Sequence, residues 1–206
     1  MGGRLLAIEC ATEACSVALF DGTTFFDGRY EVLGRGHAER LVPMIAELPD
    51  RGRAERIFVG LGPGSFTGIR IGLAAARALG LAWGAEVRGY PTLALVAAMA
   101  RSKRPGPVSV CMSGGHGEWF VQDFDAEGLS EGDILSLRPE AASGAARHDT
   151  VAGSQSEALV ALRGSGDALP LLPDARHALQ LPETVLTPDL APLYGRPPDA
   201  KVKGAA

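Results

Sequence analysis

Cysteine, aromatic residues and long apolar runs are all scarce in this 206-residue sequence. Three cysteines, an odd number without metal-ligand spacing, exclude a disulfide scaffold, so we interpret them as small buried side chains in a reducing compartment. No stretch reaches the roughly 18 consecutive apolar residues of a membrane span. Glu9 and Glu13 interrupt the first twenty residues, which argues against a signal peptide. These absences predict a cytoplasmic protein that makes no contact with a membrane.

Lysine is missing from the first 102 residues, and its absence there excludes a P-loop, which needs a lysine after its second glycine. The four histidines are scattered, and no G-x-S-x-G motif occurs. We therefore expect no metal, no cofactor and no catalytic residue. A formal net charge of −4 argues against a protein that binds nucleic acid without a partner. Such a protein needs clustered Lys and Arg side chains to neutralise the phosphates.

A glycine-rich turn, GPGSFTGIRIG at residues 62–72, is the most informative feature that is present. It follows a strand-like run at 57–61 and precedes a helix predicted from about 68 to 84. Such a turn either approaches a ligand or another chain closely, or adopts positive φ angles. The spacing is one residue too long for a dinucleotide fingerprint. We take as its candidate residues Gly62, Gly64, Ser65, Thr67 and Gly68.

The predicted helix after this turn is apolar around most of its circumference, since Arg70 and Arg77 are its charged residues between 69 and 83. A helix of this kind is buried on more than one side. One of those sides could be a subunit interface, or the helix could lie wholly inside its own lobe. The sequence leaves both interpretations open.

The order of the remaining elements predicts an α/β protein with two halves. Strands are expected at 5–10, 15–20 and 24–26, a helix at 37–48, a strand at 86–90 and a helix from 91 to 100. A basic Pro/Gly segment at 101–107 divides an N-terminal lobe, residues 1–100, from a C-terminal lobe, residues 101–206. The second lobe begins with a hairpin over 108–124. We predict a short strand at 160–162 and an extended, proline-rich tail after 188.

Three segments resemble the TsaB family, also called YeaZ. They are the hairpin LLAI…EACSVAL at 5–19, the helix start HAERLVP at 37–43, and the glycine-rich turn. The tail PLYGRPPDAK at 192–201 is also similar. The resemblance implies a two-lobed actin-like ATPase (ASKHA) fold, with a mixed sheet and flanking helices.

The resemblance also implies a role in forming N6-threonylcarbamoyladenosine on tRNA. In that family a larger paralogue, TsaD, transfers the threonylcarbamoyl group, the TsaB-type chain is its non-catalytic partner, and an ATPase, TsaE, joins them. The tRNA would be gripped mainly by the other subunits. The implied partner interface comprises Leu41, Met44, Ile45, Leu48, Arg70, Leu73, Ala76, Arg77, Leu79, Gly80 and Trp83.

Three positions depart from the family pattern. Glu9-Cys10-Ala11 stands where the family usually has Asp-Thr-Ser, and the sequence SGGH at 113–116 stands where it usually has Asp-Ala-Arg-Arg. Gly195 occupies a position that is generally Leu. The first change weakens any nucleotide–metal role in the cleft between the lobes, so the departures favour a scaffold over an enzyme.

Two rival functions remain. A small actin-like phosphotransferase would bind ATP at Glu9 and the glycine-rich turn, although no constellation of catalytic acids supports it. A peptidase would need a metal-binding His pair or a nucleophile elbow. Exposed apolar helices also predict a homodimer when the partner is missing.

Overall fold

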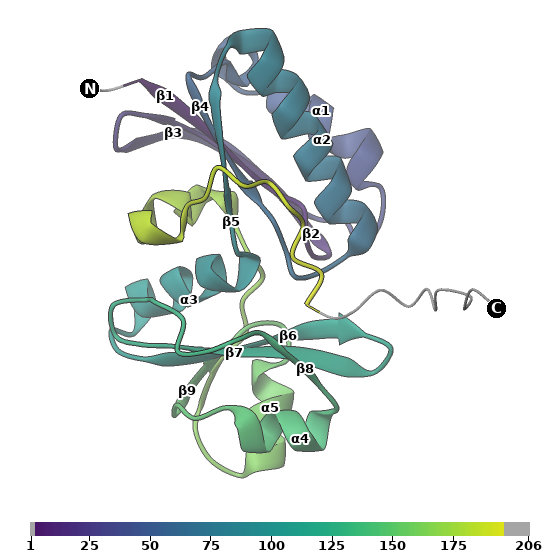
Figure 1. The fold of residues 1–206 in the computed structure, drawn as a ribbon, viewed down its shortest axis with the longest axis vertical. Coiled ribbons are helices and arrows are strands. Elements are labelled where there is room, and N and C mark those ends of the chain that lie inside the picture. Colours follow the sequence, from purple (N-terminus) through teal and green to yellow (C-terminus); the bar gives the residue numbers. More distant parts are fainter. Residues whose placement is uncertain (1–2, 196–206) are drawn as a thin grey trace, which may run out of the picture.

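Two five-stranded mixed sheets form the framework of the chain, in a computed structural model whose described part is residues 3–195 (Figure 1). The first sheet has the order β3-β2-β1-β4-β5. Its strands are β1 (Arg4–Glu9), β2 (Ala14–Asp21), β3 (Thr24–Val32), β4 (Arg56–Gly60) and β5 (Glu86–Tyr90). The first three strands are antiparallel neighbours, whereas β4 and β5 run parallel to β1. The predicted opening meander is therefore present, and β4 and β5 extend it into a mixed sheet.

Strand β1 is buried on both faces because helices or loops cover each side. Leu6 and Ile8 pack with α1 (His37–Ala46) and α2 (Phe66–Trp83). Leu5 and Ala7, which alternate with them, point to the opposite face. Figure 1 shows α1 and α2 side by side on one face of the sheet. A short 3-10 helix, Pro49–Gly52, links α1 to β4.

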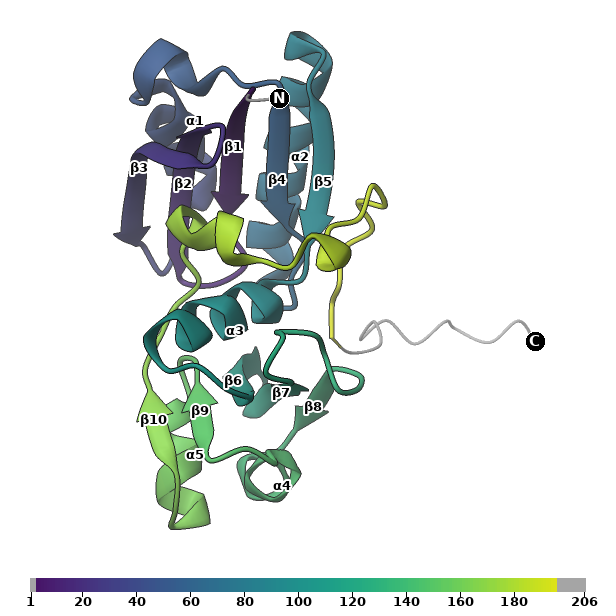
Figure 2. The same ribbon diagram turned by 90° about the vertical axis from the view of Figure 1, so that its left-hand side faces the viewer.

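The second sheet repeats the topology of the first, with the order β10-β9-β6-β7-β8. Its strands are β6 (Val108–Gly115), β7 (Glu118–Phe124), β8 (Leu135–Leu137), β9 (Thr150–Ala152) and β10 (Asp167–Leu169). Again an antiparallel hairpin is joined to parallel strands. Helices α4 (Pro139–Ala145) and α5 (Ser156–Arg163) cover its outer face (Figure 2). The repeat gives the two-lobed arrangement that the sequence predicted.

Helix α3 (Thr92–Lys103) lies between the two sheets and is buried on all sides over residues 92–100. Its side chains share one core with Leu5 and Phe58 of the first sheet and with Val110 and Phe120 of the second. Within the described chain α3 is thus the helix enclosed on all sides, whereas α2 keeps an exposed outer side. Because α3 has aliphatic residues on every side, it can cover both sheets at once.

The chain returns to the first lobe after β10. The 3-10 helix η2 (Ala175–Gln180) packs on the face of the first sheet opposite to α1 and α2. A second 3-10 helix, Glu183–Val185, follows it. Thr187 then pairs with Gly89 at the β5 edge of the sheet. The predicted division at residue 101 did not include this return, because no local pattern encodes it. The predicted extended tail is described as far as residue 195, and residues 196–206 lie outside the described part.

The prediction of a strand at 160–162 is wrong, because these residues lie in α5. Three apolar residues fit either structure, and here Gly164 ends a helix in the left-handed conformation, with φ of 74°. Among residues 3–195, no helix combines the length and apolar character that crossing a membrane requires.

Candidate functional site

The glycine-rich turn connects β4 to α2. Ser65 caps the helix, because its Oγ accepts a hydrogen bond from the Gly68 amide at 3.2 Å. Gly62 has a φ of 96°, which favours glycine. Thr67 is exposed in the first turn of α2. The turn therefore forms where the sequence predicted it, at the edge of the space between the lobes.

The turn lies directly against the loop between β1 and β2. A Cβ atom at Gly64 would stand less than 3.0 Å from the Ala11 carbonyl oxygen, and one at Gly68 less than 3.0 Å from that of Cys10. The Ser65 amide donates to the Ala11 carbonyl at 2.6 Å. These glycines thus permit a close approach within the same chain. That approach occupies an amide that a phosphate would need.

Glu9 is fully buried beneath the turn. Its carboxylate accepts hydrogen bonds from the Ala11 amide at 2.7 Å and from the Thr92 hydroxyl at 3.1 Å. The Thr92 hydroxyl in turn accepts from the Gly62 amide. Burial raises the pKa of Glu9 to about 7, while these hydrogen bonds oppose the rise. Glu9 therefore joins β1, the turn and α3, instead of facing the cleft.

A cavity of about 240 Å³ opens beside the turn, between the two lobes. Ala11 and Ser65 line it from the first lobe, and Met112, Ser113 and Ser154 line it from the second. Glu13 is the charged residue among its lining residues. A triphosphate placed here would therefore meet a carboxylate and no basic side chain from the described lining. This electrostatic environment is unfavourable for ATP.

Most of the apolar residues predicted for the partner interface lie in the core of the first lobe. Leu41, Met44, Ile45, Leu48, Leu73 and Ala76 are at most 4% exposed, and Gly80 is also buried. Leu79 and Trp83 are half-buried beside the same core. A partner cannot touch the fully buried side chains in this conformation, so the direct contacts expected of those residues need correction. Helical spacing marks the apolar side of a helix but does not show what covers it.

The outward side of the same two helices is nevertheless apolar at several positions. Leu81 is 89% exposed, Val42 62% and Phe66 53%. Ala74, Ala78 and Ala82 are also exposed on α2, and Pro43 is exposed on α1. We call these seven residues the outer helix face. Small residues there would let another helix approach closely.

Arg70 and Arg77 are exposed, but both already contact the returning tail. The Arg70 guanidinium lies 3.6 Å from the Phe66 ring centroid, and its Nε donates to the Tyr194 hydroxyl at 3.2 Å. Tyr194 stacks on Phe66, with ring centroids 5.1 Å apart. Arg77 donates to the Leu190 carbonyl at 3.0 Å. No local pattern indicates these contacts, which join residues more than a hundred positions apart.

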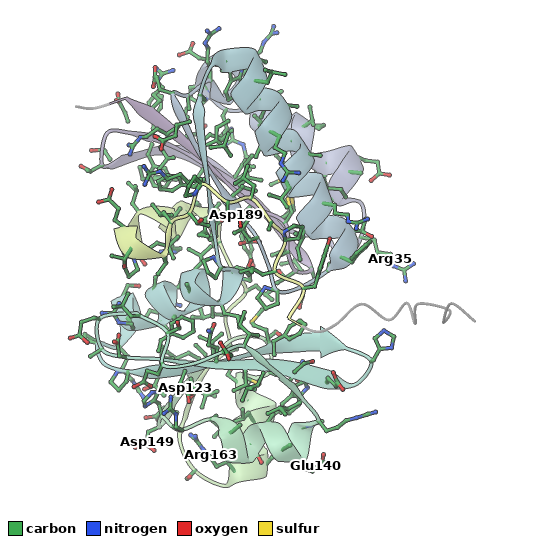
Figure 3. The ribbon with its side chains drawn as sticks, viewed as in Figure 1. Arg35, Asp123, Glu140, Asp149, Arg163 and Asp189 are labelled. Atoms are coloured by element: carbon green, nitrogen blue, oxygen red, sulfur yellow. The ribbon has the colours of Figure 1, made fainter. Side chains whose placement is uncertain are left out.

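A polar cluster surrounds Asp123 in the second lobe. Asp123 lies in β7 and is only 8% exposed (Figure 3). Ser109 donates to it, and Arg147 pairs with it at 2.6 Å. Ligand atoms of Asp123, Glu131 and His148 lie within 4.8 Å of one another. Arg147 also pairs with Glu131, so an arginine already supplies positive charge at this cluster.

Comparison with known proteins gives consistent matches. The family model described as "TsaD: tRNA N6-adenosine threonylcarbamoyltransferase" matches residues 31–148. The tRNA threonylcarbamoyladenosine biosynthesis protein TsaB of Escherichia coli is 39% identical over 150 residues, which are 66% of this chain and 63% of that protein. The TsaB of Haemophilus influenzae is 41% identical over 99 residues, covering 45% of this chain and 40% of that protein. The aligned region thus spans less than two thirds of these curated relatives.

Solved structures agree with the sequence matches. A Pseudomonas aeruginosa protein described as similar to peptidase YEAZ has a TM-score of 0.74 and 30% identity, over 86% of this chain and 89% of that one. The YeaZ structure from the same organism has a TM-score of 0.73 and 28% identity, over 86% and 90%. The ethanolamine utilization protein EutJ of Carboxydothermus hydrogenoformans shares the fold alone. Its TM-score is 0.50 at 11% identity, over 86% of this chain and 88% of that one. The two repeated sheets are those of the actin-like ATPase fold, and the chain belongs to the TsaB (YeaZ) family.

Proposed function

We propose that this protein is the non-catalytic partner of a TsaD-type paralogue in the biosynthesis of tRNA N6-threonylcarbamoyladenosine. Its relatives in Escherichia coli and Haemophilus influenzae are named for that biosynthesis, and the matching family model describes the transferase. The chain binds and stabilises the paralogue, and a TsaE-type ATPase joins the pair. It meets tRNA only through the complex, in the cytoplasm. By itself it catalyses no reaction.

The outer helix face is the observation that carries this proposal. Leu81 and Val42 project apolar side chains into solvent, next to exposed alanines on α2. Exposed apolar surface of this kind marks a site of protein association. Because the inner sides of α1 and α2 already fill the core of the first lobe, the outer face is what a partner can cover. A second copy of the chain covers it when the paralogue is missing.

The geometry of the glycine-rich turn favours this function over an ATP-dependent phosphotransferase. Ser65 and Gly64 are engaged with the loop at Ala11, and Glu9 is buried under the turn. A peptidase has no support from the described residues, because they contain no pair of histidines among the potential metal ligands. Isothermal titration with Mg-ATP tests the first rival, and binding by the isolated chain at micromolar concentration would favour it.

Mixing the purified chain with its TsaD-type paralogue tests the proposal, with the mass measured by size exclusion and light scattering. We expect a heterodimer. Ala78→Arg, on the exposed side of α2, should weaken it at least tenfold, since it places a long charged side chain in an apolar interface. Ala161→Arg, on an exposed position of α5 in the second lobe, is the matched control and should bind normally.

Two results would overturn the proposal. No complex at tens of micromolar would exclude the partnership. Equal loss of binding in Ala78→Arg and Ala161→Arg, with both variants folded by circular dichroism, would show that the outer helix face is not the surface concerned.

A further inference from the structure

Cys10 and Cys15 face each other across the first hairpin. Glu9 pairs with Ser16 in the antiparallel register; Cys10 directly follows β1, and Cys15 precedes Ser16 in β2. Their sulfur atoms are 3.6 Å apart. The third cysteine, Cys111, lies in the second lobe in a separate hydrophobic cluster.

We propose that Cys10 and Cys15 are a redox-active dithiol that forms a reversible intramolecular disulfide when a peroxide reaches it. A disulfide needs a sulfur–sulfur distance of about 2.05 Å, so the sulfurs must approach by about 1.5 Å. The hairpin already holds the two residues in register. The proposal does not depend on the partner function above, because it rests on the distance and register of the two cysteines themselves.

The two thiols have different roles in the reaction. The hydrogen bond between the sulfurs lowers the pKa of Cys15 and raises that of Cys10. We assign the attacking thiolate to Cys15, whose pKa is lowered; the same disulfide forms if the two thiols exchange roles. Burial raises the pKa of Cys111 to about 12, so its thiol is a poor nucleophile and serves as an internal control.

The chemistry balances with one hydrogen peroxide per disulfide. The Cys15 thiolate attacks one peroxide oxygen, the O–O bond breaks, and the departing hydroxide takes the thiol proton as water. The Cys10 sulfur then attacks the Cys15 sulfur, the S–O bond breaks, and a second water leaves with the remaining thiol proton. Two thiols are oxidised, one peroxide is reduced, and two waters form.

Access favours a small oxidant. Both cysteines are at most 2% exposed, so a bulky disulfide cannot reach them directly. The cavity between the lobes, however, is lined by Ala11, Thr12 and Glu13, which form the loop between the two cysteines. Its volume of about 240 Å³ admits a molecule the size of peroxide.

Oxidation would also act on the glycine-rich turn. The Cys10 carbonyl lies against Gly68, and the Ala11 carbonyl accepts the hydrogen bond from Ser65. Drawing Cys10 toward Cys15 therefore displaces the loop on which the first turn of α2 is held. Hydrogen exchange of the Ser65 amide should become faster in the oxidised protein.

Peptide mapping of the full, folded chain tests the proposal. The reduced protein is treated with hydrogen peroxide, alkylated under denaturing conditions and cut after glutamate. Glu13 lies between the two cysteines, so a disulfide keeps residues 10–13 attached to the peptide that carries Cys15. We expect this linked product, with a mass two hydrogen atoms lower than the sum of the two reduced peptides. Cys111 should be alkylated, and dithiothreitol should fully reverse the link.

Variants and a denatured sample sharpen the result. Cys111→Ser should give the same linked product, whereas Cys15→Ser should give none. Peroxide treatment in guanidinium exposes all three thiols, so Cys111 should then lose its resistance to oxidation. The wild-type protein alone can overturn the proposal. It would do so if the oxidised protein released residues 10–13 as a free peptide, or if it formed a disulfide to Cys111. A linked product with unchanged Ser65 exchange would overturn its effect on the turn.

Discussion

Glu9 and Thr92 form a buried pair beneath the glycine-rich turn. The carboxyl group has no contact with solvent and depends on two hydrogen bonds, from Ala11 and Thr92. Burial disfavours its charged form, which is why its pKa rises to about 7. A proton on Glu9 is therefore linked to the stability of the fold.

We expect the free energy of unfolding to fall as the pH rises. The pKa of Glu9 is higher in the folded than in the unfolded chain, so its contribution is fully present below pH 4.5 and is lost as the pH passes through about 7. The loss is up to about 3 kcal/mol. Urea denaturation between pH 5 and pH 8 measures it, and Glu9→Gln should flatten that dependence. Glu127→Gln, an exposed acid in the second lobe, should leave it intact; a dependence that survives in Glu9→Gln would contradict the assignment.

At Gly64 the constraint is steric, because there is no room for a side chain. A side chain there meets the backbone of Ala11, which cannot rotate away as a flexible side chain could. Gly64→Ala should therefore destabilise the protein by about 2–3 kcal/mol. Gly144 in α4 has open space around its Cβ position, so Gly144→Ala should stabilise by about 0.5–1 kcal/mol. Thermal unfolding of the two variants measures both effects, and a Gly64→Ala protein as stable as the parent would refute the close approach.

Helix α2 is the element on which most of the site depends. Its inner side holds the core, its outer side is exposed, and its first turns bind the tail through Phe66 and Arg70. The sequence predicted the helix and its apolar character. It did not separate the inner from the outer side, because alanine and leucine occur on both.

Tyr194→Ala should release the tail from α2. It removes the stacking on Phe66 and the hydrogen bond from Arg70, at a cost of about 1 kcal/mol. The Leu193 amide donates to the Leu61 carbonyl, so its hydrogen exchange reports the release. We expect faster exchange at Leu193 and little change in α5, which packs on the outer face of the second sheet. Unchanged exchange at Leu193 would mean that the aromatic contact does not hold the tail.

The whole molecule is joined by two features, α3 and the returning segment. Helix α3 places one core between the two sheets, and η2 covers the free face of the first. The returning segment is held by a buried hydrogen bond in which the Ala175 amide donates to the Ser16 hydroxyl at 2.9 Å. The two lobes therefore share one hydrophobic core.

Ser16→Ala tests this connection. The substitution leaves the Ala175 amide buried without an acceptor and should cost about 1–3 kcal/mol. Ser102→Ala is the control, because the Ser102 hydroxyl bonds to Met99 in its own helix and its loss should change stability by less than about 0.5 kcal/mol. Chemical denaturation compares the two. Equal stabilities would show that the returning segment is held by packing alone.

The sequence by itself determined the order of elements as far as the hairpin at 108–124, the glycine-rich turn and the family. Each of these depends on neighbouring residues: the alternation of the β1–β2 hairpin, the spacing of glycines before α2, and the Pro/Gly break after α3. It also contained a signal that went unused, since a hairpin with a turn at residues 11–14 places Cys10 opposite Cys15. Short apolar runs such as 160–162 were the weak point, because they fit a helix as well as a strand.

Only the tertiary structure decided what each face contacts. It showed that the glycines of the turn admit the Ala11 loop, that Glu9 and Asp123 are buried, that α3 is the helix enclosed on all sides, and that residues 175–195 return to the first lobe. These facts depend on pairs of residues far apart in the chain, such as Arg70 with Tyr194 and Ser16 with Ala175. Burial is a property of such pairs, so local periodicity can mark an apolar face but cannot tell whether the protein's own chain or a partner covers it.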